Sequence, residues 1–310
     1  MRRHRVSIVV GLLSILSPGF TLYGDAAEVR VEDSVLDVTL GTTLPENLTE
    51  EQVLSWVKTS AEAVAAYCGR FPVPRVRIGI RVTELRKPVS GVTYGGRVPS
   101  IRVSLGPRAG AKDLQEDWVL THEMFHLAFP NLTSDDSWAE EGLSTYAEPV
   151  ARVRAGGMPE KQMWSEMMDG APKGLAGPGD PGLHGTDEWG RTYWGGAVFW
   201  LLADIGIREA TRNRRGLEHA VRGILDAGGD IRARWTLLRT LRVGDEAVGG
   251  TVLSDLYAQL GAKRGEVDLA DLWRRLGLQR RAGRLVYDDE APLASVRRGI
   301  VEGAARQARR

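Results

Sequence analysis

The sequence has one cysteine, few histidines and almost no net charge. Because Cys68 stands alone, an internal disulfide is excluded. The 41 basic and 40 acidic residues give a formal net charge of +1, which does not favour nucleic-acid binding, a function that usually needs a basic surface. Beyond the N-terminus, no run reaches the roughly 20 apolar residues of a membrane helix. We therefore expect no nucleic-acid partner and no membrane contact beyond the N-terminal segment, while the oligomeric state stays open.

The first residues have the layout of a targeting segment. Arg2, Arg3 and Arg5 precede a largely apolar run over residues 6–20, and small residues follow at 24–27. This order is typical of a secretory signal peptide. We therefore predict a signal peptide over residues 1–27 and an exported protein, periplasmic or secreted. An uncleaved N-terminal anchor is the alternative, although the apolar run is short for a membrane span.

Hydrophobic periodicity predicts a sheet followed by helices. Alternation predicts strands over 29–31, 36–40, 75–82, 91–96 and 101–105. Thr49, with Gln52 three residues later, marks the start of a helix that Gly69 ends. From residue 113 onward the pattern predicts helices over 113–128, 136–150, 159–168, 195–207, 216–227, 230–241, 250–261 and 268–276, with a long loop over 170–190.

These elements predict an α+β fold. A small mixed sheet with helices would form a lobe over residues 28–155, which includes the histidine motif described next. A mainly helical lobe would follow over residues 156–310. The arginine-rich last dozen residues are predicted to be a solvated tail.

Residues 121–127 read THEMFHL and contain the pattern HExxH. His122 and His126 are four residues apart, so on a helix they share one face and both imidazoles can reach one metal ion. Glu123 lies beside that face, where it can accept a proton from a metal-bound water. Zinc in catalytic sites needs a third protein ligand and an open position for the water. The alternative is an ordinary helix with a partly exposed histidine pair.

The next predicted helix offers the third ligand. Residues 138–146 read WAEEGLSTY, and the polar residues 133–136 supply a turn before them. An antiparallel return would bring a carboxylate back to the histidines. Glu141 is the predicted ligand, and Glu140 is the fallback, although it points about 100° away around the helix.

The pairing of HEMFH with WAEEGLSTY resembles the gluzincin, peptidase MA-like metallopeptidases, which include the aminopeptidase N-like and glycyl aminopeptidase-like families. The resemblance implies a thermolysin-like catalytic arrangement, one zinc ion, and a zinc ligand in the Glu that precedes Gly, here Glu141. Residues 191–197 read RTYWGGA and resemble the family's Tyr-x-x-Gly segment. That likeness implies that Tyr193 donates a hydrogen bond to the tetrahedral intermediate.

The sequence departs from aminopeptidase N relatives at one motif. Their Gly-x-Met-Glu-Asn strand binds the free amino terminus of the substrate, whereas residues 91–95 read GVTYG here and lack the Glu. Exo- versus endopeptidase action is therefore left open.

The sequence as a whole predicts a zinc-dependent hydrolase, a metallopeptidase that acts on a peptide or protein. Glu123 would be the general base and Tyr193 the oxyanion stabiliser. The alternative is a catalytically inactive exported protein of gluzincin fold that serves as a binding module or scaffold. Intact Glu123 and Tyr193 favour the enzyme, because a structural zinc site needs neither.

Overall fold

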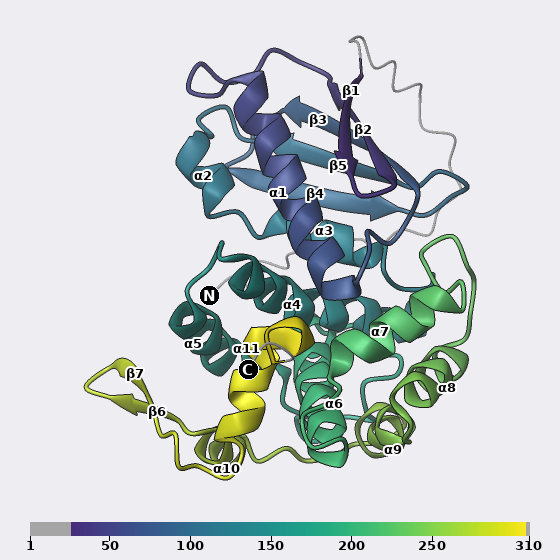
Figure 1. Cartoon of the computed structure of the whole chain (residues 1–310), viewed down its shortest axis with the longest axis vertical. Helices are drawn as coiled ribbons and strands as arrows, with labels where there is room; N and C mark the ends of the chain where they lie inside the picture. Colours follow the sequence, from purple (N-terminus) through teal and green to yellow (C-terminus); the bar gives the residue numbers. More distant parts are fainter. Residues whose placement is uncertain (1–25, 308–310) are drawn as a thin grey trace.

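The alternating segments near the start of the chain form one mixed five-stranded sheet (Figure 1). The computed structural model describes residues 26–307, so nearly all of the predicted signal peptide lies outside the described residues and stays a prediction. The strand order is β1-β2-β3-β5-β4, in which the inner strands run parallel and the two edge strands are antiparallel. The strands are β1 (Ala27–Val31), β2 (Ser34–Leu40), β3 (Arg75–Val82), β4 (Val89–Tyr94) and β5 (Ser100–Leu105).

Side chains along β3 show how the sheet is covered. Val76, Ile78 and Ile80 are buried, whereas Arg75 and Arg77 point to the opposite face and are exposed. One face of the sheet therefore belongs to the hydrophobic core. At the edge of the sheet, β4 pairs with β5 alone among the strands of residues 26–307, so one side of its backbone has no strand partner within these residues.

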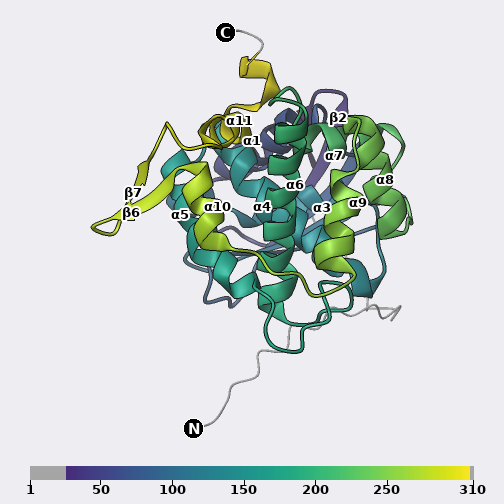
Figure 2. The same cartoon turned by 90° about the horizontal axis from the view of Figure 1, so that it is seen from below.

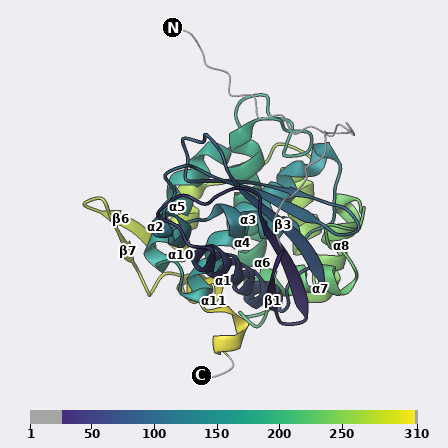
Figure 3. The ribbon, with the colours of Figure 1, turned by 90° about the horizontal axis from the view of Figure 1, so that it is seen from above.

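Helix α1 (Glu50–Cys68) runs along one face of the sheet (Figures 1 and 3). It begins and ends where the sequence predicts. The Thr49 hydroxyl accepts a hydrogen bond from the Gln52 backbone N–H at 3.2 Å, and the Gln52 side chain accepts one from the Thr49 N–H at 2.9 Å. Gly69 ends the helix at a φ of 83°, a conformation that favours glycine.

The rest of the chain is mainly helical, which confirms the predicted fold class. Helix α6 lies in the middle of the other helices (Figure 2). The longer helices are α4 (Ser137–Ala155), α5 (Glu160–Gly170), α6 (Gly196–Ala210), α7 (Leu217–Asp226), α8 (Leu237–Val248), α10 (Leu269–Leu276) and α11 (Ala294–Gln307). Short helical elements are η1 (Ser134–Asp136), η2 (Ala171–Gly174), η3 (Arg191–Gly195), α9 (Val252–Leu256) and η4 (Tyr257–Gly261).

The prediction of one continuous helix over 113–128 is wrong, because the helix is interrupted. The chain forms α2 (Ala111–Gln115), breaks, and begins again as α3 (Val119–His126). The carboxylate of Asp117 accepts hydrogen bonds from the backbone N–H groups of Val119 at 3.0 Å and Leu120 at 2.9 Å. These bonds satisfy donors at the start of α3, so the histidine motif lies on a short helix with its own cap.

Two further helices were predicted with wrong bounds. No helix spans 230–241, because α8 begins only after Thr236, whose hydroxyl accepts a hydrogen bond from the Arg239 backbone N–H at 3.3 Å. The helix predicted over 250–261 is α9 followed by the π-helical turn η4. The predicted loop over 170–190 includes the helical turn η2.

The C-terminal part is more ordered than a solvated tail. A hairpin of β6 (Leu278–Arg281) and β7 (Arg284–Tyr287) precedes α11. Arg297 of α11 is 1% exposed and donates hydrogen bonds to the carbonyl oxygens of Leu276 at 2.9 Å and Gly277 at 3.2 Å. Within the described part of the chain, no helix is long and apolar enough to cross a membrane. The lobe boundary near residue 155 stays a prediction.

Candidate metal centre

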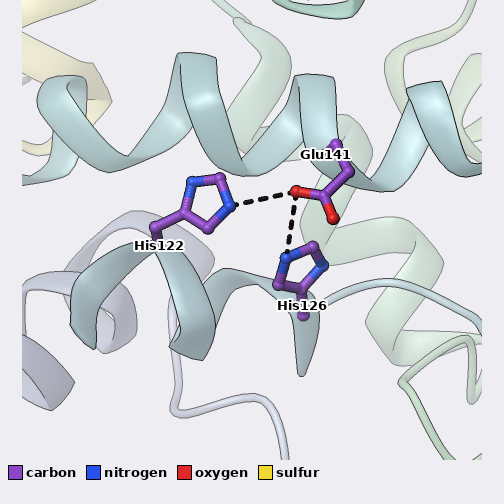
Figure 4. Close-up of side chains that lie close together, drawn as sticks. All are labelled: His122, His126 and Glu141. Carbon is purple, nitrogen blue, oxygen red and sulfur yellow. Dashed lines mark hydrogen bonds and ion pairs between the residues drawn. The ribbon is translucent and has the colours of Figure 1, made fainter. Parts of the chain in front are cut away.

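Helices α3 and α4 bring two histidines and one glutamate to a single point (Figure 4). The Nε2 atom of His122 lies 3.2 Å from Oε2 of Glu141, and Nε2 of His126 lies 3.5 Å from the same oxygen. One nitrogen or oxygen atom from each of the three side chains lies within 4.8 Å of the others. Within residues 26–307 this is the one group of three His, Cys, Asp or Glu side chains with such spacing.

The donor set fits zinc. Two imidazole nitrogens and one carboxylate oxygen are ligands that zinc prefers, and catalytic zinc sites commonly have three protein ligands. Two donor atoms that bind one tetrahedral zinc at ordinary bond lengths lie about 3.3–3.6 Å apart. The distance of 3.5 Å from His126 to Glu141 lies within that range, and the distance of 3.2 Å from His122 to Glu141 lies just below it.

The charges in the cluster favour a bound cation. Burial opposes ionisation of Glu141, but the nearby His126 and His122 overcome it and hold the pKa of the carboxyl well below its ordinary value. Burial likewise lowers the pKa of His126, yet the carboxylate of Glu141 outweighs this effect and raises the pKa to about 9. The cluster therefore stabilises positive charge, which either protons or a metal ion can supply.

Glu140, the fallback ligand, turns away from this cluster. Its Oε1 atom accepts a hydrogen bond from the Leu132 backbone N–H at 2.6 Å. Burial raises the pKa of this carboxyl to about 7, although that hydrogen bond opposes the rise. Glu140 therefore holds the turn between α3 and α4, and Glu141 is the carboxylate that reaches the histidines.

Glu123 is buried beside the edge strand β4. The hydroxyl oxygen of Thr93 lies 2.7 Å from Glu123 Oε2 and 2.8 Å from the Glu123 backbone oxygen. The hydroxyl has one proton, so it donates to one of these acceptors at a time. A Cβ on Gly91 would lie 2.6 Å from Glu123 Cγ, so only glycine allows this approach of strand and helix. Sequence reasoning identified the strand but not these two contacts.

Tyr193 faces the cluster from a different helix. It lies in the π-helical turn η3, directly before α6, and such turns are frequent at functional sites. Its ring stacks on His122 with centroids 6.2 Å apart and planes at 20°. Burial, followed by the carboxylates of Glu141 and Glu123, raises the pKa of the phenol above its ordinary value. The side chain therefore shares the site with the histidines.

A close contact between glycines joins α4 to the start of α6. A Cβ on Gly142 would lie 2.4 Å from Gly196 Cα, so neither helix has room for a side chain there. Trp200 Nε1 donates a hydrogen bond to the Ala139 carbonyl at 2.9 Å. Gly142 follows Glu141 directly, so this packing fixes the distance between the carboxylate and Tyr193. No local sequence pattern indicates the Gly142–Gly196 contact.

His184 does not join the cluster. Its Nδ1 atom lies 2.9 Å from Asp136 Oδ1, and the side chain is about half exposed in the loop before η3. This agrees with the sequence, in which nothing ties His184 to the motif.

Solved structures of an aminopeptidase N family protein and of an M1 zinc metallopeptidase are similar to this chain in fold. An aminopeptidase N family protein from Idiomarina loihiensis matches with a TM-score of 0.63 and 14% identity, over 86% of this chain and 52% of that chain. A variant of the M1 zinc metallopeptidase from Deinococcus radiodurans matches with a TM-score of 0.52 and 14% identity, over 79% and 52% of the two chains. No protein-family model and no curated protein matches the sequence.

The likeness is one of fold. The chain is similar to these two proteins in its arrangement of sheet and helices, and it spans about half the length of their solved chains. The Deinococcus protein has also been solved with a Tyr-Ser-Ala substrate, a match with a TM-score of 0.51 and 13% identity over 78% and 52% of the two chains. The resemblance found in the sequence motifs is therefore confirmed at the level of the fold.

Proposed function

We propose that this protein is a zinc-dependent peptidase whose metal is held by His122, His126 and Glu141. The observation that carries the proposal is the convergence of these three donors from two helices, with distances of 3.2 and 3.5 Å to one carboxylate oxygen. Glu123 and Tyr193 lie around the same point, and a purely structural zinc site would need neither.

Each side chain has a distinct chemical task in this proposal. Zinc, when bound, supplies a Lewis acid that polarises a carbonyl and lowers the pKa of water. The Glu123 carboxylate takes the proton of the attacking water and passes it to the leaving amine nitrogen. Since Oε2 faces the Thr93 hydroxyl, Oε1 is the oxygen that serves the water. The Tyr193 hydroxyl donates a hydrogen bond to the carbonyl oxygen as negative charge develops there.

The edge strand β4 suggests how a peptide would lie. In the described part of the chain, one backbone side of β4 has no strand partner, and Thr93 of this strand contacts Glu123. An extended peptide can pair with such an edge through main-chain hydrogen bonds. This placement would bring a scissile bond beside the cluster, and its main-chain hydrogen bonds would suit a peptide or protein substrate.

Metal analysis followed by a digest tests the proposal. Elemental analysis of the purified chain, dialysed after exposure to zinc, is expected to give about one zinc per chain. Mass spectrometry of a peptide library incubated with that material is expected to show cleavage that a chelator stops and zinc restores. A chain that retains no zinc contradicts the metal site. A zinc-loaded chain that cleaves no peptide supports the inactive binding or scaffold protein instead.

A further inference from the structure

Two tryptophans near the cluster are unusually exposed. Trp118 is 53% exposed and Trp189 is 52% exposed, whereas Trp138, Trp164 and Trp200 are buried in the core. Tryptophan has a large apolar surface and is enriched where a ligand or partner binds, so a half-exposed indole beside a candidate site can contribute to binding. Neither exposed indole is needed to fill the core, which is packed by the other tryptophans.

Both exposed tryptophans lie one helical turn before a residue of the site. Trp118 precedes His122 by four residues, and their rings meet edge to face with centroids 5.6 Å apart. Trp189 precedes Tyr193 by four residues, and their rings stack with centroids 5.6 Å apart at 28°. Because Tyr193 stacks on His122, the four rings form a continuous series, which we call the aromatic row (Trp118, His122, Tyr193 and Trp189).

The aromatic row places apolar surface at both ends of the reaction centre. Its two inner members are a predicted zinc ligand and the predicted hydrogen-bond donor to the carbonyl. Its two outer members therefore lie next to the residues that would hold the scissile bond. By contrast, the exposed Val92 and Tyr94 of β4 alternate with Gly91 and Thr93, so their side chains point to the face away from Glu123.

We propose that Trp118 and Trp189 are specificity residues that bind aromatic side chains of a peptide on the two sides of the scissile bond. This inference rests on the proposed peptidase function. Aromatic rings prefer stacked or edge-to-face contacts and gain affinity beyond the apolar area that they bury. Peptides with Phe, Tyr or Trp beside the scissile bond are therefore the preferred substrates.

Equilibrium binding tests recognition separately from catalysis. The zinc-loaded Glu123→Gln variant is titrated, with fluorescence anisotropy as the readout, into two labelled peptides that differ only in Phe or Ala at the two flanking positions. The Phe peptide is expected to bind about tenfold more tightly or better. Adding Trp118→Ala or Trp189→Ala is expected to remove part of that preference, and both changes together most of it. Equal affinity for the two peptides, or an unchanged preference in both tryptophan variants, overturns the proposal.

Matched variants separate recognition from folding. Trp118→Phe and Trp189→Phe keep an aromatic ring and are expected to keep the preference for the Phe peptide. Leu238→Ala removes an exposed apolar side chain on α8 and is expected to change neither affinity. Zinc content and thermal melting are measured for every variant. If the Phe variants lose the preference as completely as the Ala variants while they remain folded and zinc-loaded, ring stacking is not the cause.

Hydrolysis of the same two peptides by the zinc-loaded wild type distinguishes the two proposals. Cleavage of both peptides at equal kcat/KM supports the peptidase and overturns the specificity. A Phe preference in binding with no cleavage supports recognition by the aromatic row and overturns the peptidase. Sedimentation of the wild type tests whether a second copy of the chain binds the exposed indoles. A concentration-dependent dimer that is abolished by Trp118→Ala and by Trp189→Ala would assign the indoles to a dimer interface and overturn the proposed specificity.

Discussion

The two sides of the candidate site are held by different forces. On the sheet side, helix α3, which carries Glu123 and the two histidines, packs against β4, and the hydroxyl of Thr93 is a hydrogen-bond partner of Glu123. On the helix side, Glu141 and Tyr193 are fixed by close packing of α4 on the start of α6. We therefore expect the activity to be sensitive to the loss of single polar atoms on the sheet side. We expect the stability to be sensitive to added side-chain volume on the helix side. Glu141 connects the two sides, since its carboxylate reaches both histidines.

The helix side is also anchored by a buried polar group behind it. Asp204 of α6 accepts hydrogen bonds from the Tyr146 hydroxyl of α4 at 2.8 Å and from Arg208 at 2.7 Å. Burial raises the pKa of Tyr146, so its phenol stays protonated and remains a donor to Asp204. Removing one member of such a buried ionic group leaves an unpaired charge, which is costly. These contacts keep α4 and α6 in one alignment without reaching the cluster.

The largest expected effect on activity comes from removing Glu141, whose carboxylate connects the two sides of the site. Glu141→Ala removes the carboxylate that reaches both histidines, so the purified variant is expected to retain no zinc and to cleave no peptide. Glu140→Ala is the matched control one position earlier. Because Glu140 binds the Leu132 backbone N–H instead, this variant should keep its zinc. Elemental analysis of both proteins decides the matter, and zinc loss in the Glu140 variant alone would mean that the ligand is Glu140.

The next largest effect is expected from a replacement on the sheet side that leaves the predicted metal ligands unchanged. Glu123→Gln has nearly the same shape but cannot accept the water proton, so its rate is expected to fall by roughly 10²–10⁴. Zinc content and thermal melting should stay at wild-type values. Steady-state kinetics on a cleaved peptide provides the measurement. Wild-type turnover in a fully zinc-loaded Gln variant would remove Glu123 from the proposed mechanism.

A slightly smaller loss is expected from the helix side. Tyr193→Phe deletes only the hydroxyl, which would meet the carbonyl oxygen once negative charge develops. Loss of one such donor lowers kcat by roughly 10²–10³, with little change in KM. The ring should still stack on His122, so zinc content serves as the control. An unchanged kcat would show that Tyr193 only packs.

Added volume tests the helix side in a different way. Gly142→Ala places a Cβ within 2.4 Å of backbone atoms of α6, so the helices must separate. We expect the free energy of unfolding to fall by about 1–3 kcal/mol and zinc affinity to fall with it. Gly250→Ala is the control, because a Cβ there meets open space at an ordinary φ. Urea unfolding measures the free energy of unfolding of both variants. Equal losses in the two variants would contradict the packing argument.

The sequence was sufficient wherever a signal is local. The alternation in β3, the cap at Thr49 and the spacing of His122 and His126 are short-range patterns, and each lies where predicted. The failures involve contacts between distant residues and one local helix cap. Nothing near Gly142 in the sequence indicates that Gly196 packs on it, and the cap formed by Asp117 was hidden inside a continuous helical pattern. Long-range packing also explains why Arg297, one of the C-terminal arginines, is buried and not solvated.

The smallest expected effect concerns the hydrogen bond between Thr93 and Glu123 on the sheet side. Thr93→Val keeps the shape of the side chain but removes the hydroxyl that faces Glu123 Oε2 at 2.7 Å. Water can replace part of a lost hydrogen bond, so we expect kcat to fall by only about tenfold, with KM and zinc content nearly unchanged. Thr93→Ser restores the donor and should restore the rate, which a purely structural loss would not predict. Val92→Thr adds a hydroxyl on the opposite face of β4 and should change nothing. If the Val and Ser variants have the same kcat, the hydroxyl does not position Glu123, and the sheet side depends on the close approach at Gly91 instead.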